Sequence, residues 1–459
     1  MQSTGNYIKD QTNYMSDFFQ KEKRKTLFFF LLLSPAFITA QTAAKDSLLK
    51  EVTLKNAVEY AIKNQPRIQQ SLIDEAITAF TIKSKLADWY PQVNFNYNLQ
   101  HNFILQTNII GGNPVKFGVE NTSFGQFTVS QAIFNKDVLL AKRTRGDVQL
   151  QTKQATESNK TDLAANVSKA FYDVLATEQQ IKVADENIVR IERSLKDATS
   201  QYKAGITDKI DYKRATISLN NIRASKKSNE ELFRAKIEYL KSLMGYPETA
   251  PLNIVYNSLA MEKEIALDTL QQPDYKNRIE YKLLETQRKL LQSNVLYNKW
   301  GFLPSVAANG AYNLNYQNDQ FGKLYGNNFP NSFAALIFTM PIFQGGKRKA
   351  NIKTAELQLK RSNQDIVSLK NTVNAQYTQA LALYKSSVEN YTALKENVAL
   401  AKEVYDVIQL QYRSGIKTYL EVVTAETDLR TSQINYFNAL YQVLSSKVDV
   451  QKALGQIAY

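Results

Sequence analysis

The chemistry open to this chain is limited, because its 459 residues include no cysteine and a single histidine, His101. Thiolate metal sites, disulfides, cysteine nucleophiles and histidine-based catalysis are therefore excluded. An enzyme would have to use carboxylates, lysine, serine or tyrosine, and no motif in the sequence assembles them. His101 falls in a strand pattern, which predicts a structural role. The sequence thus indicates no enzyme, no metal and no cofactor.

A two-faced surface is written into PQVNFNYNLQ, which begins at Pro91 and alternates apolar and amide side chains. Such alternation predicts a β-strand with two different faces. It suits a sandwich with one solvated face, or a membrane barrel with lipid outside and a wet lumen inside. We favour the barrel. The expected lipid-facing residues are Val93, Phe95, Tyr97 and Leu99, continuing to Phe103 and Leu105, and the lumen-facing residues are Asn94, Asn96 and Asn98.

The net charge of +14 could indicate nucleic acid or an anionic membrane surface as a partner. Lys and Arg are scattered between Glu and Asp along the expected helices, and no segment interleaves aromatic residues with cations. We therefore interpret the charge as solvated helix faces and expect no nucleic acid.

The N-terminus is typical of an export signal. The basic segment KEKRK, Lys21–Lys25, precedes an apolar run of about a dozen residues that ends in small residues near Ala40. Residues 1–40 are thus predicted to be a signal peptide with an atypical prefix, and Met15 is an alternative start to Met1. No later run of 18 apolar residues exists, so we expect any membrane insertion to use strands.

Long helices follow from the absence of Gly and Pro over 147–204 and 347–414, with shorter tracts at 206–244 and 416–454. A helix of about 65 residues spans roughly 100 Å. That exceeds the core of any single domain, so the helices must pack side by side as coiled coils.

An internal repeat organises these elements. QYKAGI at Gln201 recurs as QYRSGI at Gln411, and the same spacing places Gly245 on Gly455. We predict a first repeat at 41–245, a linker or equatorial segment at 246–274 and a second repeat at 275–459. Each runs helix, β-hairpin, long helix, glycine turn and helix, with the turns at Gly205 and Gly415.

The two hairpins, at about 91–134 and 304–343, supply four strands. The first is expected to be joined by IIGGNPVKFG and the second by QNDQFGKLYGNNFPN. Open sheet edges are not tolerated in lipid, and closed membrane barrels begin at about eight strands. The chain must therefore oligomerise to close a barrel. Trp89 and Trp300, at the strand entrances, are candidates for an aromatic interface belt.

In this order, the segments resemble the TolC-like outer-membrane efflux proteins. The resemblance rests on TLKNAVEYAIKNQPRI from Thr53, WYP at Trp89, MPIFQGGKRKANIKTAELQL from Met340 and YRSGIKTYLEVVTAETDL from Tyr412. It implies a mainly α, internally duplicated fold with a long coiled-coil α-helical barrel. It also implies four strands per protomer in a trimeric 12-stranded transmembrane β-barrel.

The same resemblance implies a function. Such trimers lie in the outer membrane, surrounded by its lipid, with their helices in the periplasm. They act as passive exit ducts of efflux or type I-like secretion systems. Their partners are a periplasmic adaptor (membrane fusion) protein and an inner-membrane transporter. The cargo, whether drug, metal, siderophore or protein, stays open, as does the identity of the partners.

The resemblance further implies a gate at the periplasmic helix tips, around the two glycine turns. A tyrosine and a basic residue of the second turn are expected to bond a carboxylate after the first turn. The matching positions are Tyr412, Lys417 and Asp211, with Glu421 at a lumen position. Thr424 stands where members of the family place a second carboxylate. Lys417 replaces an arginine, and this removes a bidentate contact.

Two other classes of protein share some of these features. A structural or adhesive coiled-coil protein with a small barrel anchor would share the export signal and the helices, but it gives no reason for the duplicated hairpin-plus-helix unit. A peptidoglycan-active enzyme would need a catalytic acid in a cleft, and the sequence indicates none.

Overall fold

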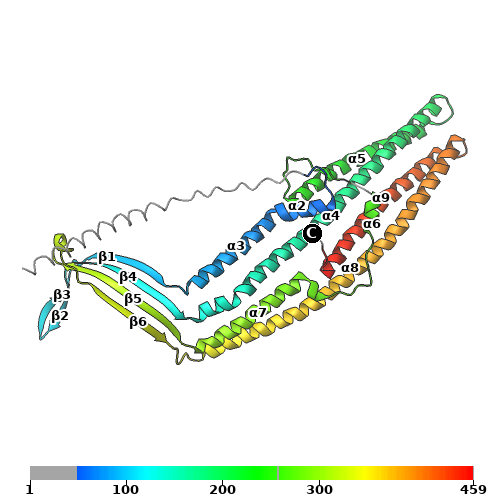
Figure 1. The fold of residues 1–459 in the computed structure, drawn as a ribbon. Helices are drawn as coiled ribbons and strands as arrows, with labels where there is room; N and C mark the ends of the chain where they lie inside the picture. The colour runs from blue at the N-terminus through cyan, green and yellow to red at the C-terminus, as the bar shows by residue number, and fades with distance from the viewer. Residues whose placement is uncertain (1–48, 256–257, 458) are drawn as a thin grey trace, which may run out of the picture. The chain divides into compact units, whose positions relative to one another are not determined.

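The computed structural model describes residues 49–255, 258–457 and 459, so the predicted signal peptide lies outside them. The first half of the chain contains α2 (Leu54–Asn64), α3 (Pro66–Ala87), β1 (Gln92–His101), β2 (Gln106–Ile110), β3 (Asn113–Phe117), β4 (Asn121–Phe134), α4 (Lys136–Lys203) and α5 (Lys209–Met244). The second half contains α6 (Ser258–Glu264), α7 (Ile279–Lys299), β5 (Ser305–Asn318), β6 (Asn331–Thr339), α8 (Lys347–Arg413) and α9 (Tyr419–Leu454). Short 3₁₀ turns occupy Tyr275–Asn277, Trp300–Phe302 and Phe321–Lys323 (Figure 1).

The helices pack lengthwise, as the long uninterrupted tracts require. Helix α4 pairs with α5 and α8 with α9, while α3 and α7 lie along the sheet-side ends of α4 and α8. Helix α4 has 68 residues and therefore spans about 100 Å. It starts well before the predicted tract, because Asn135 caps its first turn by accepting a 2.7 Å hydrogen bond from Asp137 N. The helix then continues through Gly146.

Each half closes with a glycine in the left-handed conformation. Gly245 (φ +66°) ends α5 and Gly455 (φ +71°) ends α9. A Cβ on Gly245 would lie 2.8 Å from the Asn64 carbonyl oxygen, and a Cβ on Gly455 would lie 3.0 Å from that of Asn277. Each glycine thus allows the last helix of its half to contact the backbone just before an earlier helix of the same half, α3 in the first half and α7 in the second.

The four long strands form one antiparallel sheet in the order β1-β4-β5-β6. Residues paired across antiparallel strands share a face, and the register pairs Phe95 with Phe127 and Phe127 with Tyr312. The apolar face defined by this register includes Val93, Phe95, Tyr97, Leu99, Phe127, Val129, Tyr312, Leu314, Leu336 and Phe338. The amide face includes Asn94, Asn96, Asn98, Gln126, Asn309, Asn313 and Asn315.

The first hairpin differs from its prediction. Strand β1 ends at His101, so Phe103 and Leu105 lie beyond it, and β2 and β3 form a separate two-stranded ribbon. The strand stops there because Asn102 bonds the carbonyl oxygens of Glu120 and Val119 across the base of the ribbon, and Gly118 (φ +97°) breaks the returning strand. The ribbon turns at Gly111 and Gly112, which both have positive φ, as a two-residue hairpin loop requires.

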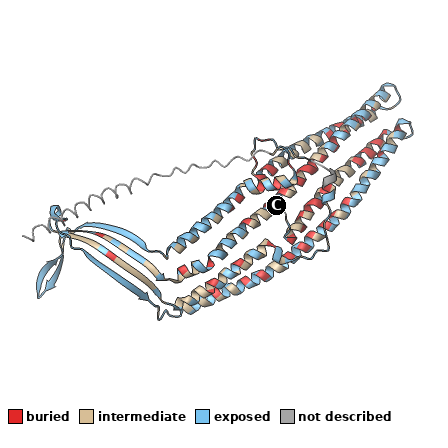
Figure 2. Cartoon of the chain, viewed as in Figure 1, coloured by how far each residue is buried: buried red, intermediate tan, exposed pale blue. Residues whose placement is uncertain are grey.

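Buried residues concentrate along the middle of α4 and the second half of α9, whereas β1 and β6 are exposed along their whole length (Figure 2). The apolar face therefore leaves large side chains uncovered in the single chain: Phe95 is 56% exposed and Leu336 is 70% exposed. Among the described helices, none combines the length and the hydropathy needed to cross a bilayer.

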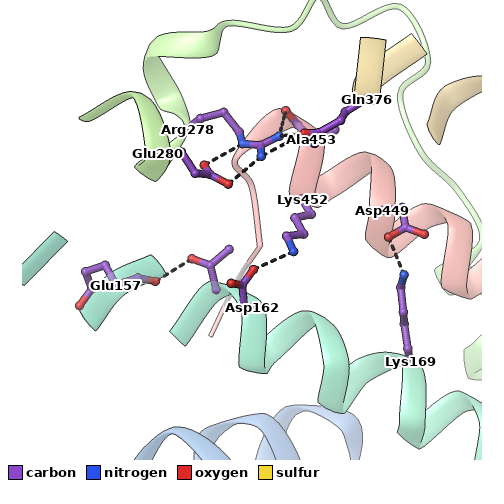
Figure 3. A network of polar contacts seen from close by, with 10 residues as sticks. Glu157, Asp162, Lys169, Arg278, Glu280, Gln376, Asp449, Lys452 and Ala453 are labelled. Atoms are coloured by element: carbon purple, nitrogen blue, oxygen red, sulfur yellow. Dashed lines mark hydrogen bonds and ion pairs between the residues drawn. The ribbon is translucent and has the colours of Figure 1, made fainter. Parts of the chain in front are cut away.

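Polar contacts join the two halves near the end of α9 (Figure 3). The buried Arg278 donates to Glu280, at 2.7 and 3.0 Å, and to the Ala453 carbonyl oxygen at 3.3 Å. Two ion pairs link α9 to α4: Lys452–Asp162 at 2.7 Å and Lys169–Asp449 at 2.5 Å. The second half is thereby fixed to the first along α4.

Candidate gate at the helix tips

The α4–α5 and α8–α9 turns are built alike. Gly205 (φ +71°) and Gly415 (φ +75°) follow the ends of the long helices. Ile206 N donates to the Gln201 carbonyl oxygen at 2.9 Å, and Ile416 N donates to that of Gln411 at 2.9 Å. This bonding satisfies carbonyls at a helix end and demands a left-handed residue. The repeated QYxxGI segments therefore fold into the same tight turn.

Tyr412 links the two tips. Its hydroxyl donates to Gln201 Oε1 at 3.0 Å, and so joins α8 to the last turn of α4. Its ring lies 5.8 Å from that of Tyr419, in a buried cluster with Ala215 of α5 and Val422 of α9. Burial raises the pKa of Tyr412, and the negative charges of Asp211 and Asp197 add to the effect. The hydroxyl therefore stays protonated and can keep donating.

Lys417 and Glu421 form a local pair. Lys417 Nζ lies 2.6 Å from Glu421 Oε1, while Glu421 Oε2 accepts from Thr418 N at 2.9 Å and from the Thr418 hydroxyl at 3.0 Å. These bonds complete a capping box at the start of α9. They lower the pKa of Glu421 to about 2, so the carboxylate is ionised at neutral pH.

The expected bond to Asp211 is not made within the single chain, and it stays a prediction for the assembled tips. Among the described residues, Asp211 is hydrogen-bonded to neither Tyr412 nor Lys417, which bond Gln201 and Glu421 instead. Lys417 reaches Glu421 within one helical turn, and Tyr412 reaches the end of α4. Asp211 acts on Tyr412 only through its charge. Thr424 is exposed and bonds back to the Leu420 carbonyl oxygen.

A buried carboxyl lies about two turns after the start of α9. Glu426 is 4% exposed, and its Oε1 lies 4.0 Å from Arg190 Nε of α4; neither atom has a hydrogen-bond partner. Burial raises the pKa of Glu426 to about 7, although Arg190 and Arg430 oppose the shift. Arg190 also donates to Asn187 at 2.6 Å. The contact between the two helix pairs thus contains an ionisable group that titrates near neutrality.

Sequence reasoning missed Gln201 and Glu426. Gln201 lies in the repeated QYKAGI segment, but only the fold brings it to Tyr412. Glu426 belongs to the TAETDL segment, and its neighbours Ala425 and Leu429 are buried too, so the spacing of apolar residues on this helix was the available signal.

The other predicted residues lie at the two ends of the sheet. Trp89 and Trp300 are half-buried where strands meet helices, and Lys142 Nζ lies 5.7 Å from the Trp89 ring. His101 Nδ1 bonds Asn121 Oδ1 at 2.7 Å at the far end of β1. In the described part of the chain, no group of three or more Asp, Glu or His residues could hold a metal ion.

Comparison with known proteins assigns this architecture. The family model described as outer membrane efflux protein matches residues 57–245 and 281–456. Outer membrane protein TolC of Escherichia coli (strain K12) is 21% identical over 442 residues, which are 93% of this chain and 86% of TolC. The probable efflux pump outer membrane protein TtgC of Pseudomonas putida is 22% identical over 315 residues, 67% of this chain and 63% of TtgC.

Solved structures agree on the fold. The crystal structure of CusC, described as forming a transmembrane channel, superposes with a TM-score of 0.71 at 18% identity. The superposition covers 91% of this chain and 95% of CusC.

Proposed function

Because this chain belongs to the family of outer membrane efflux proteins, we propose that three copies form the exit duct of a multicomponent efflux system, gated at the helix tips. Family membership makes it an outer-membrane channel protein and not an enzyme. In this proposal the duct is passive: a continuous wet tunnel spares the solute from crossing lipid.

The open sheet is the observation that carries the proposal. In the single chain β1 and β6 are edge strands, and the apolar face is exposed. Neither feature is compatible with water or with lipid unless the sheet closes. Three chains supply twelve strands, with β6 of one copy pairing with β1 of the next. The apolar face then meets lipid and the amide face lines the lumen.

The gate would use both turns. Tyr412 ties the second tip to the first through Gln201, and the Lys417–Glu421 pair stiffens the start of α9. Opening requires the α8–α9 pair to move away from α4, which would break the Tyr412–Gln201 bond. Asp211 would contribute its negative charge at the same level.

The expected partners are a periplasmic adaptor and an inner-membrane transporter. An open hollow of about 880 Å³ lies between α4 and α8 beside the tip. It is lined by Glu192, Arg193, Lys196, Asp197, Gln201, Tyr412 and Arg413. Charges of both signs on two parallel helices offer an adaptor helix a polar docking groove next to the gate.

Electron microscopy of the detergent-extracted protein tests the architecture. Threefold cylinders longer than about 100 Å, with a cap at one end, are expected from the helix lengths. Monomers, or helical bundles without a barrel cap, would instead favour an exported structural or adhesive coiled-coil protein.

A further inference from the structure

Basic side chains gather where the sheet meets the helices. The start of β1, the end of β4, the start of β5 and the end of β6 lie at the same end of the sheet, and α3, α4, α7 and α8 adjoin this end (Figure 1). We name the cationic residues there the junction band: Lys83, Lys85, Lys136, Lys142, Arg143, Arg145, Lys299, Lys347, Arg348, Lys349 and Lys353. Within 83–88, 136–147, 299–305 and 347–353 the carboxylates are Asp88, Asp137 and Asp147, and Glu356 follows just beyond the last segment.

Most of these cations have no carboxylate partner among the described residues. Among the described residues, the ion pairs of the band are Lys85–Asp88 at 4.0 Å and Lys353–Glu356 at 3.8 Å, both between exposed side chains. Asp137 accepts a 2.6 Å hydrogen bond from the Tyr297 hydroxyl. Further along the helices cations are paired closely, as in Lys226–Asp185 at 2.6 Å. The junction segments therefore carry a local excess of positive charge.

Aromatic rings accompany these cations. Arg348 lies 4.3 Å from the Phe302 ring, Lys136 Nζ lies 4.5 Å from the Tyr297 ring, and Lys142 Nζ lies 5.7 Å from the Trp89 ring. Such contacts hold long, flexible side chains at a fixed level. Aromatic residues beside Lys and Arg are typical of the boundary between a bilayer and water.

One part of the band is concave and polar. A hollow of about 380 Å³ is lined by Lys136, Arg348, Asn298, Asn351, the start of β5 and the end of β6, together with one carboxylate, Asp137, which accepts from Tyr297. Arg348 Nη2 donates to the Pro341 carbonyl oxygen at 2.8 Å, whereas its buried Nε has no partner. Arg348 and Lys136 both line this hollow, and Arg and Lys are the side chains that bind phosphate oxygens.

We propose that the junction band binds the phosphate groups of anionic phospholipids in the periplasmic leaflet of the outer membrane. The inference rests on the proposed function, because a sheet in the bilayer and helices in the periplasm set the band at headgroup level. A lipid fits better than an acidic protein, because the cations come from four separate segments across one end of the sheet and adjoin the exposed apolar face. Attraction to anionic lipid also gives the uncompensated charge a partner.

The test measures headgroup preference in a bilayer. The full-length protein is reconstituted into phosphatidylcholine vesicles that contain spin-labelled phosphatidylglycerol or spin-labelled phosphatidylcholine, and the association of each lipid with the protein is compared. We expect a preference of about threefold for phosphatidylglycerol that falls as salt increases. Equal association of the two lipids overturns the proposal.

Substitutions locate the effect. Lys347→Gln, Arg348→Gln and Lys349→Gln together are expected to remove most of the preference. The matched control is Lys203→Gln, Lys209→Gln and Lys213→Gln, an equal loss of charge at the α4–α5 tip, which should leave the preference unchanged. If both triple variants have the same effect, the band is not the site. Should the junction triple fail to insert, Arg348→Gln alone must still lower the preference.

Two further arms separate the explanations. Inorganic phosphate added to the vesicles should not abolish the preference beyond the effect of matched ionic strength; if it does, the site takes a free phosphate ion rather than a lipid. Conductance of the same vesicles is recorded in parallel. Protein that conducts but shows no lipid preference overturns the junction band alone, whereas protein that never conducts overturns the proposed function.

Discussion

At the scale of single residues, Glu426 lies in the least ordinary environment of any carboxyl discussed above. It is buried between the helix pairs. Its Oε1 lies 4.0 Å from Arg190 Nε, and neither of these two atoms has a hydrogen-bond partner. Tyr405, Tyr419 and Arg430 complete its charged and titratable surroundings. A buried pair with such long geometry contributes little to stability, because attraction does not offset the loss of hydration.

We predict that Glu426 makes stability fall as pH rises from about 4.5 to about 7. Its pKa is raised from 4.5 to about 7, so within this window the folded protein keeps a proton that the unfolded chain has released. The effect is at most on the order of 3 kcal/mol. Thermal denaturation between pH 4 and 8 measures it, and Glu426→Gln should flatten the profile.

Glu421 provides a control of opposite sign. Its pKa is lowered to about 2, so its contribution is present above pH 4.5 and is lost as pH falls toward 2. Glu421→Gln should therefore lower the free energy of unfolding at neutral pH. The increase in stability toward acidic pH, which Glu426 causes, should remain in this variant. If Glu426→Gln and Glu421→Gln give the same profile, the burial argument for Glu426 is wrong.

The gate prediction also belongs to this scale. Tyr412→Phe removes only the hydroxyl that bonds Gln201 and should raise the conductance of the closed channel in a planar bilayer. Asp211→Ala combined with Lys417→Ala should raise it too, by removing the negative charge near Tyr412 and the Glu421 pair. Thr424→Ala, at an exposed side chain of α9, is the control. Unchanged closed-state conductance in the first two variants would remove the gate assignment.

At the scale of elements, the four glycines that end helices fall into two kinds. Gly205 and Gly415 have positive φ but open space around them, whereas Gly245 and Gly455 also touch the backbone of a preceding segment. The repeat in the sequence placed all four glycines, but it could not distinguish the kinds, because the contacts are made with residues about 180 positions away.

Alanine substitution should separate the two kinds. Gly415→Ala is expected to cost about 1–2 kcal/mol from the left-handed backbone alone. Gly245→Ala should cost distinctly more, since its Cβ would lie 2.8 Å from the Asn64 carbonyl oxygen. Chemical denaturation of the two variants measures the difference, and equal costs would mean that the α5 end relaxes without penalty.

Strand faces give the next prediction. Phe95→Asp places a charge on the apolar face and should prevent trimer assembly in the membrane, while Asn96→Asp places it on the amide face and should be tolerated. Heat-resistant trimer on a gel is the measurement. If the two substitutions act alike, the strand has no distinct lipid and lumen faces; if only Asn96→Asp prevents assembly, the assignment is reversed.

How far the sequence predicts the fold depends on how local the signal is. Alternation in PQVNFNYNLQ and the Gly- and Pro-free tracts give strands and helices, because these patterns lie within one element. The β2–β3 ribbon was missed because Asn102 fixes it through bonds to residues 119 and 120, beyond any local window. The junction band was missed for a similar reason: its cations come from four segments that only the sheet brings together at one end.

At the scale of the whole chain, Arg278 ties the start of the second half to its last helix, close to where that helix contacts α4. It is 6% exposed, and its guanidinium bonds Glu280 and the Ala453 carbonyl oxygen. Burial alone would raise the pKa of Glu280, yet the contact with Arg278 holds it below its ordinary value. This contact connects the start of the second half with its last helix, close to the ion pairs that reach α4.

Arg278→Met should therefore destabilise the protein strongly, by about 3 kcal/mol, because it leaves Glu280 and a buried carbonyl without their donor. Lys169→Met removes the more exposed Lys169–Asp449 pair and should cost less than about 1 kcal/mol. Thermal denaturation of both variants tests the ranking. A larger loss for Lys169→Met would mean that the α4–α9 pair between the halves contributes more than the Arg278 contacts within the second half.

The uncovered edges of β1 and β6 also bear on how quickly the protein reaches its working form. In the proposed ring, the strand pairings within each chain form at a rate independent of concentration, but every β6–β1 seam needs an encounter between copies. The final folding step is thus intermolecular, and its yield should rise more steeply than in proportion to the amount synthesised. At low expression, chains would wait with both edges open, which is the period in which they are most exposed to proteolysis and aggregation.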